Sequence, residues 1–257
     1  MGDLYAPDLA ERFPLLRQPD RVPRRVALVS ITSNRGLCGA FNANLIRTTR
    51  TRLADWEDQG VTVELYQIGR KGIGYFKFTG REMTGQRSDI GDRPTPEHAT
   101  ELVSPLMERF AAEELDAVEV IFAKFVSPLS TPPTLLPILP IRPPTNRGAE
   151  GPKDRGERGG RSAGPPVGRS VPNYILRPSA EAILGEILPM YVRDQMFRAL
   201  VETAASEQGA RRTAMKSATD NAGDMIDRLR RTYNRARQGQ ITQEIAEIVG
   251  GAEALSG

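Results

Sequence analysis

The chain has 257 residues, of which 39% are hydrophobic and 26% are charged, and its formal net charge is +3. This length supports one well-packed core with an appendage, and no apolar run approaches the ~18 residues of a membrane span. The single cysteine, Cys38, rules out an internal disulfide. Between Arg142 and Ser170 there are seven Lys or Arg and three Asp or Glu, so the positive excess lies there. No predicted element carries a basic stripe with interleaved aromatic residues, which argues against nucleic-acid binding.

The first half of the chain predicts an α/β domain over residues 25–142. Residues 1–24 contain a short helical piece followed by Pro14, Pro19 and Pro23, which keep the approach to the first strand extended. Apolar runs and helical periodicity then alternate. The expected elements are a strand over 25–32, a helix over 41–58, a strand over 61–68, a helix over 95–114 and a strand over 117–125. Such alternation is typical of an open, mostly parallel, Rossmann-like sheet.

A change of composition follows the last of these strands. Residues 143–172 consist mainly of Gly, Pro and Arg with hardly a large apolar side chain, which predicts a disordered insert. Residues 173–189 then predict the last strand, at Tyr174–Leu176, and a short helix of the same domain. We expect Pro189 to mark the join between that helix and the next one.

Residues 190–257 predict one long helix, because no proline occurs between Met190 and Val249. At about 1.5 Å per residue, the stretch from Met190 to Val249 would be roughly 90 Å long, which exceeds the diameter of a compact domain. Residues recur at steps of three and four, a spacing that is typical of a stripe facing another helix. The stripe consists of Val201, Ala204, Gln208, Arg211, Met215, Ala218, Ala222, Met225 and Leu229.

The members of this stripe are mostly small or polar, so they contribute little burial energy. Gly209, Gly223 and Gly239 each cost about 1 kcal/mol relative to alanine inside a helix. We therefore expect this helix to be marginal by itself and to need a partner. A bundle within this chain is a weaker interpretation, since no other segment supplies a second helix of matching length.

The loop over 33–42 follows the first predicted strand, where a dinucleotide site would lie. It lacks a tight Gly-x-Gly start and the Lys-Ser/Thr pair of a phosphate-binding loop. The second strand ends without an acidic residue that could hold a ribose. The sequence therefore predicts a packed turn, with no catalytic residue, cofactor or metal. A nucleotide-binding α/β enzyme remains an alternative, as does a scaffold protein that docks an unrelated partner through its long helix.

Two stretches carry a resemblance to a known family. The loop Ser33-Asn34-Arg35-Gly36-Leu37-Cys38-Gly39-Ala40-Phe41-Asn42 resembles a motif of the gamma subunit of rotary F-type ATP synthases. The second stretch is more specific and spans the long helix. It includes Ala205-Ser206-Glu207-Gln208, Ala218-Thr219-Asp220-Asn221-Ala222-Gly223, Tyr233-Asn234-Arg235-Ala236-Arg237-Gln238, Ile241-Thr242-Gln243-Glu244 and Glu247-Ile248-Val249-Gly250-Gly251-Ala252.

The resemblance covers nearly all of residues 22–257 and implies the rotor subunit of the central stalk. Such a subunit couples proton flow through a membrane ring to ATP synthesis or hydrolysis, and has no active site or cofactor of its own. The implied partners of its single copy are the alpha and beta subunits of the catalytic ring, the epsilon subunit and the membrane c-ring. The implied location is peripheral, on the cytoplasmic face of a bacterial plasma membrane. The α/β domain would be the foot, and the long helix would be half of an antiparallel coiled coil.

The family pairs this helix with an N-terminal helix of comparable length. Residues 1–24 resemble the connection that follows that helix, so we expect this chain to lack it. Asn34 stands where the family usually has Asp, which removes a charge beside Arg35. The insert holds no cysteine, which excludes the thiol switch of photosynthetic relatives.

The resemblance also implies contact residues. Those expected to touch the catalytic ring are Arg237, Gln238, Thr242, Glu244, Ile245 and Ile248. For the polar members, a solvated helix face is the alternative. Tyr174 is expected to contact the rotor ring.

Overall fold

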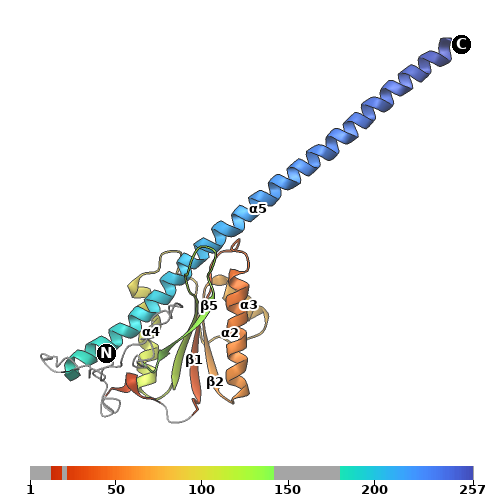
Figure 1. Cartoon of the computed structure of the whole chain (residues 1–257). Helices are drawn as coiled ribbons and strands as arrows, with labels where there is room; N and C mark the ends of the chain where they lie inside the picture. The colour runs from red at the N-terminus through yellow and green to blue at the C-terminus, as the bar shows by residue number, and fades with distance from the viewer. Residues whose placement is uncertain (1–12, 19–21, 142–179, 257) are drawn as a thin grey trace, which may run out of the picture.

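A five-stranded sheet with helices on both faces forms the body of the protein, and one helix projects far beyond it (Figure 1). The computed structural model describes residues 13–18, 22–141 and 180–256. The strands lie in the order β3-β2-β1-β4-β5. They are β1 (Arg25–Ile31), β2 (Thr62–Ile68), β3 (Gly85–Arg87), β4 (Ala117–Ala123) and β5 (Pro133–Leu139). The helices are α2 (Phe41–Asp58), α3 (Arg70–Phe78), α4 (Pro96–Ala111) and α5 (Ala180–Ser256), and Pro14–Leu16 forms a 3-10 turn.

Four of the five strands run parallel, and the two central ones, β1 and β4, are buried almost throughout. In β4 every residue is buried, and in β1 only Arg25 is exposed. Parallel sheets need both faces covered, so near-continuous apolar runs are expected in their central strands. β5 pairs with β4 antiparallel at the edge of the sheet. The sheet is therefore mixed, but mostly parallel.

Helices cover the two faces of this sheet as separate layers. α2 and α3 pack on one face, around Leu28, Leu45 and Phe76. α4 and the first part of α5 pack on the other face, around Val29, Phe110 and a row of α5 side chains. This row consists of Leu184, Leu188, Val192, Met196, Ala199 and Leu200, whose exposed fractions lie between 0% and 5%.

α5 is one continuous helix of 77 residues. Its first part crosses the α/β domain, and the rest runs away from the domain into open space (Figure 1). From Lys216 to Ala252 every described side chain is exposed. The expectation of a long helix that mostly leaves the globular body is confirmed.

The predicted α/β class, the long C-terminal helix, the three strands and the helices over 41–58 and 95–114 are confirmed. The expected join at Pro189 is wrong, because α5 passes through it without a break. Leu188 on one side and Val192 on the other are both buried against the domain, and this packing offsets the hydrogen bond that proline removes. The sequence did not predict α3, β3 or β5. The insert over 143–172 and the strand expected at Tyr174–Leu176 lie outside the described residues.

Candidate functional site

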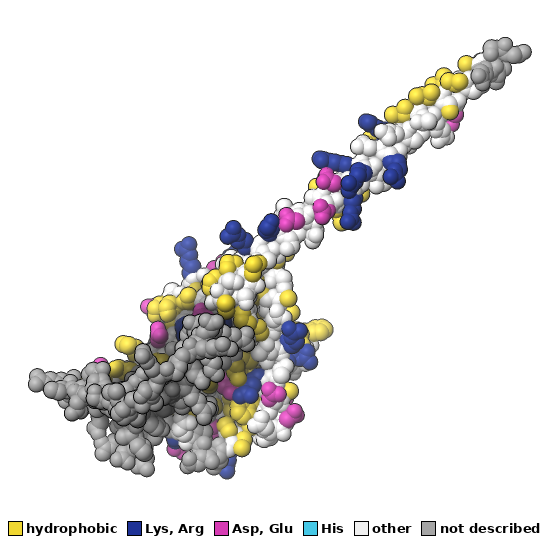
Figure 2. Space-filling view, in the orientation of Figure 1, with side chains coloured by type: hydrophobic (Ala, Val, Ile, Leu, Met, Phe, Trp, Pro, Cys, Tyr) yellow, Lys and Arg dark blue, Asp and Glu magenta, His cyan; other side chains and the backbone are white. Residues whose placement is uncertain are grey.

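The projecting part of α5 carries apolar side chains that nothing in the described chain covers. Figure 2 shows hydrophobic side chains along the projecting helix, between basic and acidic ones. Exposed apolar surface that extends along an element is typical of an interaction site. The exposed fractions range from 47% to 71% for Met225, Ile226, Leu229, Tyr233, Ile241, Ile245, Ile248 and Val249.

All six residues expected to contact the catalytic ring lie on this projecting part, and all are exposed. Residues three, four or seven apart share a helix face. Arg237, Glu244 and Ile248 therefore lie on one face. Gln238, Thr242 and Ile245 lie on a second face, about 100° around the helix from the first. Contact with a ring remains a prediction, and Tyr174 lies outside the described residues.

Part of the predicted packing stripe faces away from the α/β domain. Val201 is 41% exposed and Met215 is 45% exposed, whereas Leu200 is only 2% exposed. Residues one position apart on a helix point about 100° apart, so Val201 and Leu200 lie on different faces of α5. Ala204 of the stripe instead lines a crevice against the ends of the strands, so the stripe is only partly open where α5 crosses the domain.

The loop over 33–42 is a rigid turn held by its own side chains. Asn42 Nδ2 donates to Ser33 Oγ at 2.8 Å, and Asn42 Oδ1 accepts from the Ser33 backbone N–H at 3.0 Å. The Ser33 hydroxyl donates to the Arg35 carbonyl at 2.6 Å. Leu37 has a positive φ of 62° and is 74% exposed, while the Cys38 side chain is buried. The motif therefore forms a packed turn that presents one leucine.

This turn also occupies the backbone N–H groups at the start of α3. Those of Arg70, Lys71 and Gly72 donate to Asn34 Oδ1, the Ser33 carbonyl and Thr32 Oγ1, at 3.0 to 3.1 Å. A helix N-terminus binds phosphate through such free N–H groups. Here these N–H groups already donate to Thr32 and to the loop that follows it, so they are not free to bind a phosphate.

The Asn34 side chain links its own loop to the start of α3 and to the segment after β3. From the sequence we expected only that Asn34 removes a charge beside Arg35. The Asn34 side-chain N–H₂ donates to the carbonyls of Ser88 and Ile90, at 3.1 and 2.9 Å. A carboxylate at this position would offer no donor to these carbonyls. Arg35 pairs instead with Asp92, at 3.6 Å, so the charge beside Arg35 comes from another loop.

α5 lies over the carboxyl ends of β1 and β4, where doubly wound sheets bind their ligands. A Cβ added to Gly39 of the loop would lie 3.8 Å from Ala214 Cβ of α5. Ala210 packs against the cluster that contains Cys38 and Phe41. A small crevice remains between α5 and the strand ends, and the helix covers most of the place where a dinucleotide would lie.

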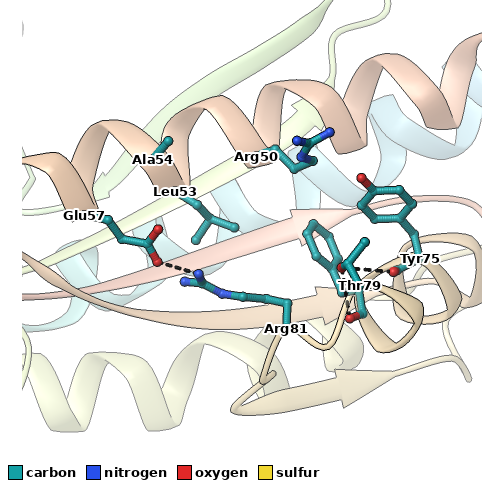
Figure 3. A pocket seen from close by; sticks show the side chains of 8 residues that line it. Arg50, Leu53, Ala54, Glu57, Tyr75, Thr79 and Arg81 are labelled. Carbon is teal, nitrogen blue, oxygen red and sulfur yellow. Dashed lines mark hydrogen bonds and ion pairs between the residues drawn. The ribbon is translucent and has the colours of Figure 1, made fainter.

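A wider groove lies between α2 and α3 (Figure 3). Arg81 crosses it and pairs with Glu57, and the Thr79 hydroxyl bonds to backbone carbonyls of its own helix. Leu53 and Phe76 form an apolar floor. Among the residues that line this groove, Glu57 is the one carboxylate, so the lining offers no paired acids for general acid–base chemistry.

Among the residues that the structure describes, no group of three or more His, Cys, Asp or Glu side chains is arranged to hold a metal ion. No helix among these residues combines the length and the apolar character needed to cross a membrane.

The residues at which α5 meets the end of β4 were not predicted from the sequence. Thr203 and Ser206 are buried polar side chains, 3% and 0% exposed, and Gly209 lies against the β4–β5 loop. Their spacing of three along the helix was visible in the sequence. Their partners, about 80 residues earlier in the chain, were not.

Comparisons with known proteins agree with this geometry. The sequence is 52% identical to the ATP synthase gamma chain of Gemmatimonas aurantiaca over 257 residues, which is all of this chain and 82% of the relative. It is 42% identical to the gamma chain of Leptospira biflexa over 243 residues, which is 95% of this chain and 78% of that relative.

Solved structures show the same fold at lower sequence identity. A chain of the Euglena gracilis mitochondrial ATP synthase, from a structure of its OSCP, F1 and c-ring, has a TM-score of 0.61 and 18% identity. The match covers 98% of this chain and 82% of that one. A chain of the central stalk and c-ring structure from Tetrahymena thermophila has a TM-score of 0.56 and 19% identity, over 83% and 85% of the two chains. The family model described as ATP synthase matches residues 1–255. With this match and the identity to curated gamma chains, the chain belongs to the ATP synthase gamma chain family.

Proposed function

We propose that this chain is the central-stalk rotor subunit of a proton-translocating ATP synthase. In this role it couples proton flow through a membrane ring to ATP synthesis or hydrolysis in a surrounding catalytic ring. The observation that carries the proposal is the projecting part of α5, a helix with exposed apolar side chains on a chain of this family. A rod of this kind fits inside a sleeve formed by other subunits.

The charge of the projecting helix suits a shaft that turns. Between Lys216 and Glu247 there are six Lys or Arg and five Asp or Glu, so the two signs nearly cancel. Both basic and acidic side chains lie along this part of the helix (Figure 2). A strongly charged shaft would be held at the angles where it met opposite charges of the ring. A balanced one has weaker preferences of this kind.

The stripe from Val201 to Leu229 requires a second helix in this role. Val201 is 41% exposed beside the buried Leu200, and Met215 is 45% exposed. The stripe also holds the small Ala204 and Ala218, which permit close approach. Helix pairs with small residues at their contact pack closely, and burial of the larger side chains supplies the stability. We expect the two helices to run antiparallel as a coiled coil.

The proposed partners are those of the family's central stalk. They are the alpha and beta subunits of the catalytic ring, the epsilon subunit and the membrane c-ring, with one copy of this chain in each complex. The α/β domain would then be the foot, with Tyr174 facing the rotor ring. The proposed location is peripheral, on the cytoplasmic face of a bacterial plasma membrane.

The two exposed faces at the far end of α5 provide a test. In the assembled ATP synthase, replacing both Arg237 and Gln238 by alanine should lower ATP turnover and leave assembly intact. Each side chain can form hydrogen bonds to the ring at certain rotary angles, worth about 1.5–3 kcal/mol when one partner is charged. Both are fully exposed within this chain, so their removal opens no cavity.

The measurement is steady-state ATP hydrolysis by the purified complex, with subunit content checked on a gel. Arg230→Ala is a matched control, since Arg230 is also exposed on α5 and lies outside the predicted ring contact. Wild-type turnover in the double variant would show that Arg237 and Gln238 are a solvated face. A complex that lacks this chain and still couples proton flow to ATP synthesis would overturn the rotor function itself.

A further inference from the structure

The end of β4 is held by α5 through both of its backbone polar groups. The Ala123 N–H donates to Thr203 Oγ1 at 3.3 Å, and the Ala123 carbonyl accepts from Ser206 Oγ at 3.1 Å. The last pair of β4 with β1 is Ile121 with Ser30, so Ala123 lies beyond the reach of that neighbouring strand. On the side of β1, two hydroxyl groups of α5 therefore take the place of a strand, while β5 pairs with Ala123 on the other side.

The contact continues along the helix into the loop after β4. The Phe125 N–H donates to Glu202 Oε2 at 3.1 Å. Thr213 Oγ1 lies 3.4 Å from the Pro128 carbonyl and 3.2 Å from the Gly209 carbonyl of its own helix, so its one proton is shared between the two. The other oxygen of Glu202 accepts from Arg198 at 2.7 Å, a bond that also raises the pKa of Arg198. From Glu202 to Thr213 is eleven residues, or about 16 Å of helix. Polar contacts with this one segment are thus spread over three turns.

Gly209 allows the loop to come this close. A Cβ added to Gly209 would lie 3.2 Å from Pro128 Cα and 3.4 Å from the Pro128 carbonyl oxygen. Both atoms belong to the backbone, so neither can turn aside as a flexible side chain would. Gly223, further along the same helix, would meet nothing within 4 Å. Of these two glycines, Gly209 is the one that packing requires.

These hydrogen bonds restrain small rotations and axial shifts of α5 on the domain more tightly than apolar packing does. Earlier in α5, the contact with the domain is made by apolar side chains such as Val192 and Met196. Apolar contact is non-directional, so it opposes a large rotation that would expose these side chains but restrains small rotations about the helix axis only weakly. Hydrogen bonds have preferred distances and angles, so those at Ala123 and Phe125 fix the rotation and the axial position of α5.

We propose that the segment Ala123–Pro128, gripped by Thr203, Ser206 and Gly209 of α5, is the clasp through which the α/β domain and the projecting helix turn as one body. This inference rests on the rotor function proposed above. Thr203, Ser206 and Gly209 are positioning residues: they touch no substrate and act by holding α5 at a fixed angle on the domain. A loosened clasp lets the shaft turn through part of each step without turning the domain that faces the membrane ring.

The test uses the complete ATP synthase in sealed vesicles, with ATP hydrolysis and proton pumping measured on the same preparation. One variant combines Thr203→Val and Ser206→Ala, and a second is Gly209→Ala. Gly223→Ala is the control for a glycine replaced in this helix. Ser217→Ala is the control for a lost hydroxyl, because Ser217 is exposed and bonds only to its own helix among the described residues.

Both clasp variants should pump several-fold fewer protons per ATP hydrolysed, while the controls keep the wild-type ratio. The single variant Thr203→Ser keeps the hydroxyl and should therefore keep the wild-type ratio of protons pumped to ATP hydrolysed. A general loss of folding or assembly lowers hydrolysis and pumping together and leaves their ratio unchanged. A wild-type ratio in both clasp variants, or an equal fall in Gly223→Ala, would overturn the proposal.

A second measurement covers variants that fail to assemble. In the isolated chain, the amides of Ala123 and Phe125 should exchange with solvent several-fold faster in Gly209→Ala than in Gly223→Ala. Equal exchange would also overturn the clasp. A wild-type complex that does not couple hydrolysis to pumping would instead contradict the rotor function, so the two failures are distinguishable.

Discussion

The two halves of α5 belong to one helix, but they are stabilised in different ways. Between Leu184 and Ser206 a full face is buried, and Val192 and Met196 are 0% exposed. Beyond Met215 every described side chain is exposed. The first half is part of the core of the α/β domain, whereas the second half obtains no tertiary burial within the described chain. Continuity of a helix therefore does not imply uniform stability along it.

The largest expected difference between the two halves is in hydrogen exchange. In the isolated monomer, amides between Thr232 and Val249 should exchange near the rate of an isolated helix, because most helical stability comes from packing. Amides between Val192 and Glu207 should exchange at least ~100-fold more slowly, since they open only with the domain. Peptide-level exchange followed by mass spectrometry measures both segments in one sample.

Strong protection throughout the second half in a verified monomer would contradict this comparison. The sequence predicted that the long helix begins at Met190, whereas α5 begins at Ala180. It becomes fully exposed only from about Met215, because the segment before that packs on α4 and β4. The exchange boundary therefore also tests where the shaft begins.

Two methionines sharpen the comparison with a single substitution in each half. Met196 is 0% exposed and Met225 is 64% exposed. Met196→Ala should lower the free energy of unfolding by ~2–5 kcal/mol, because it removes buried methylene groups and leaves a cavity. Met225→Ala should change it by less than about 0.5 kcal/mol, as is typical of exposed positions. Denaturant unfolding of the α/β domain, followed by the fluorescence of Trp56, measures both.

Equal effects of the two substitutions would mean that the second half is buried in solution. A verified dimer could produce that result, so the monomer state is checked by light scattering at the protein concentration used. Concentration-independent equality in a monomer would contradict the structure.

Sequence pattern was sufficient for elements whose pattern is local. β1 and β4 are continuous apolar runs, and α5 is long, without proline over most of its length and periodic. β5 was missed because Pro133 and Pro137 argue against a strand, yet an edge strand tolerates proline where no ladder hydrogen bond is needed. α3 was missed because it is only nine residues long and contains two glycines.

The features of the candidate site also differ in whether they could be predicted from the sequence. The stripe from Val201 to Met215 could be recognised from its spacing, and Val201 and Met215 at its ends are 41% and 45% exposed. Which face of α5 packs on the domain could not be recognised, because Leu200 and Val201 are equally apolar and only the sheet beneath distinguishes them. The hydroxyls of Thr203 and Ser206 are ordinary helix residues until Ala123 is placed beside them.

The smallest expected difference concerns two ion pairs with the same spacing of four residues. Glu207 pairs with Arg211 where α5 leaves the domain, and their side chains are 8% and 19% exposed. Lys216 pairs with Asp220 at 3.4 Å on the projecting half, where both side chains are more than 60% exposed. Arg211→Ala leaves the buried Glu207 carboxylate without its charged partner, which should lower the free energy of unfolding by about 2–3 kcal/mol. Lys216→Ala should lower it by no more than about 0.5 kcal/mol, because exposed pairs are weak and screened by salt.

Combining Arg211→Ala with Glu207→Gln distinguishes the effect of losing the ion pair from the effect of losing the other contacts of the Arg211 side chain. A neutral amide costs less to bury without a charged partner, so Arg211→Ala combined with Glu207→Gln should recover part of the loss. If Arg211→Ala instead behaved like Lys216→Ala, Glu207 would be hydrated in solution. The boundary between the two halves of α5 would then lie closer to Ser206 than the structure places it.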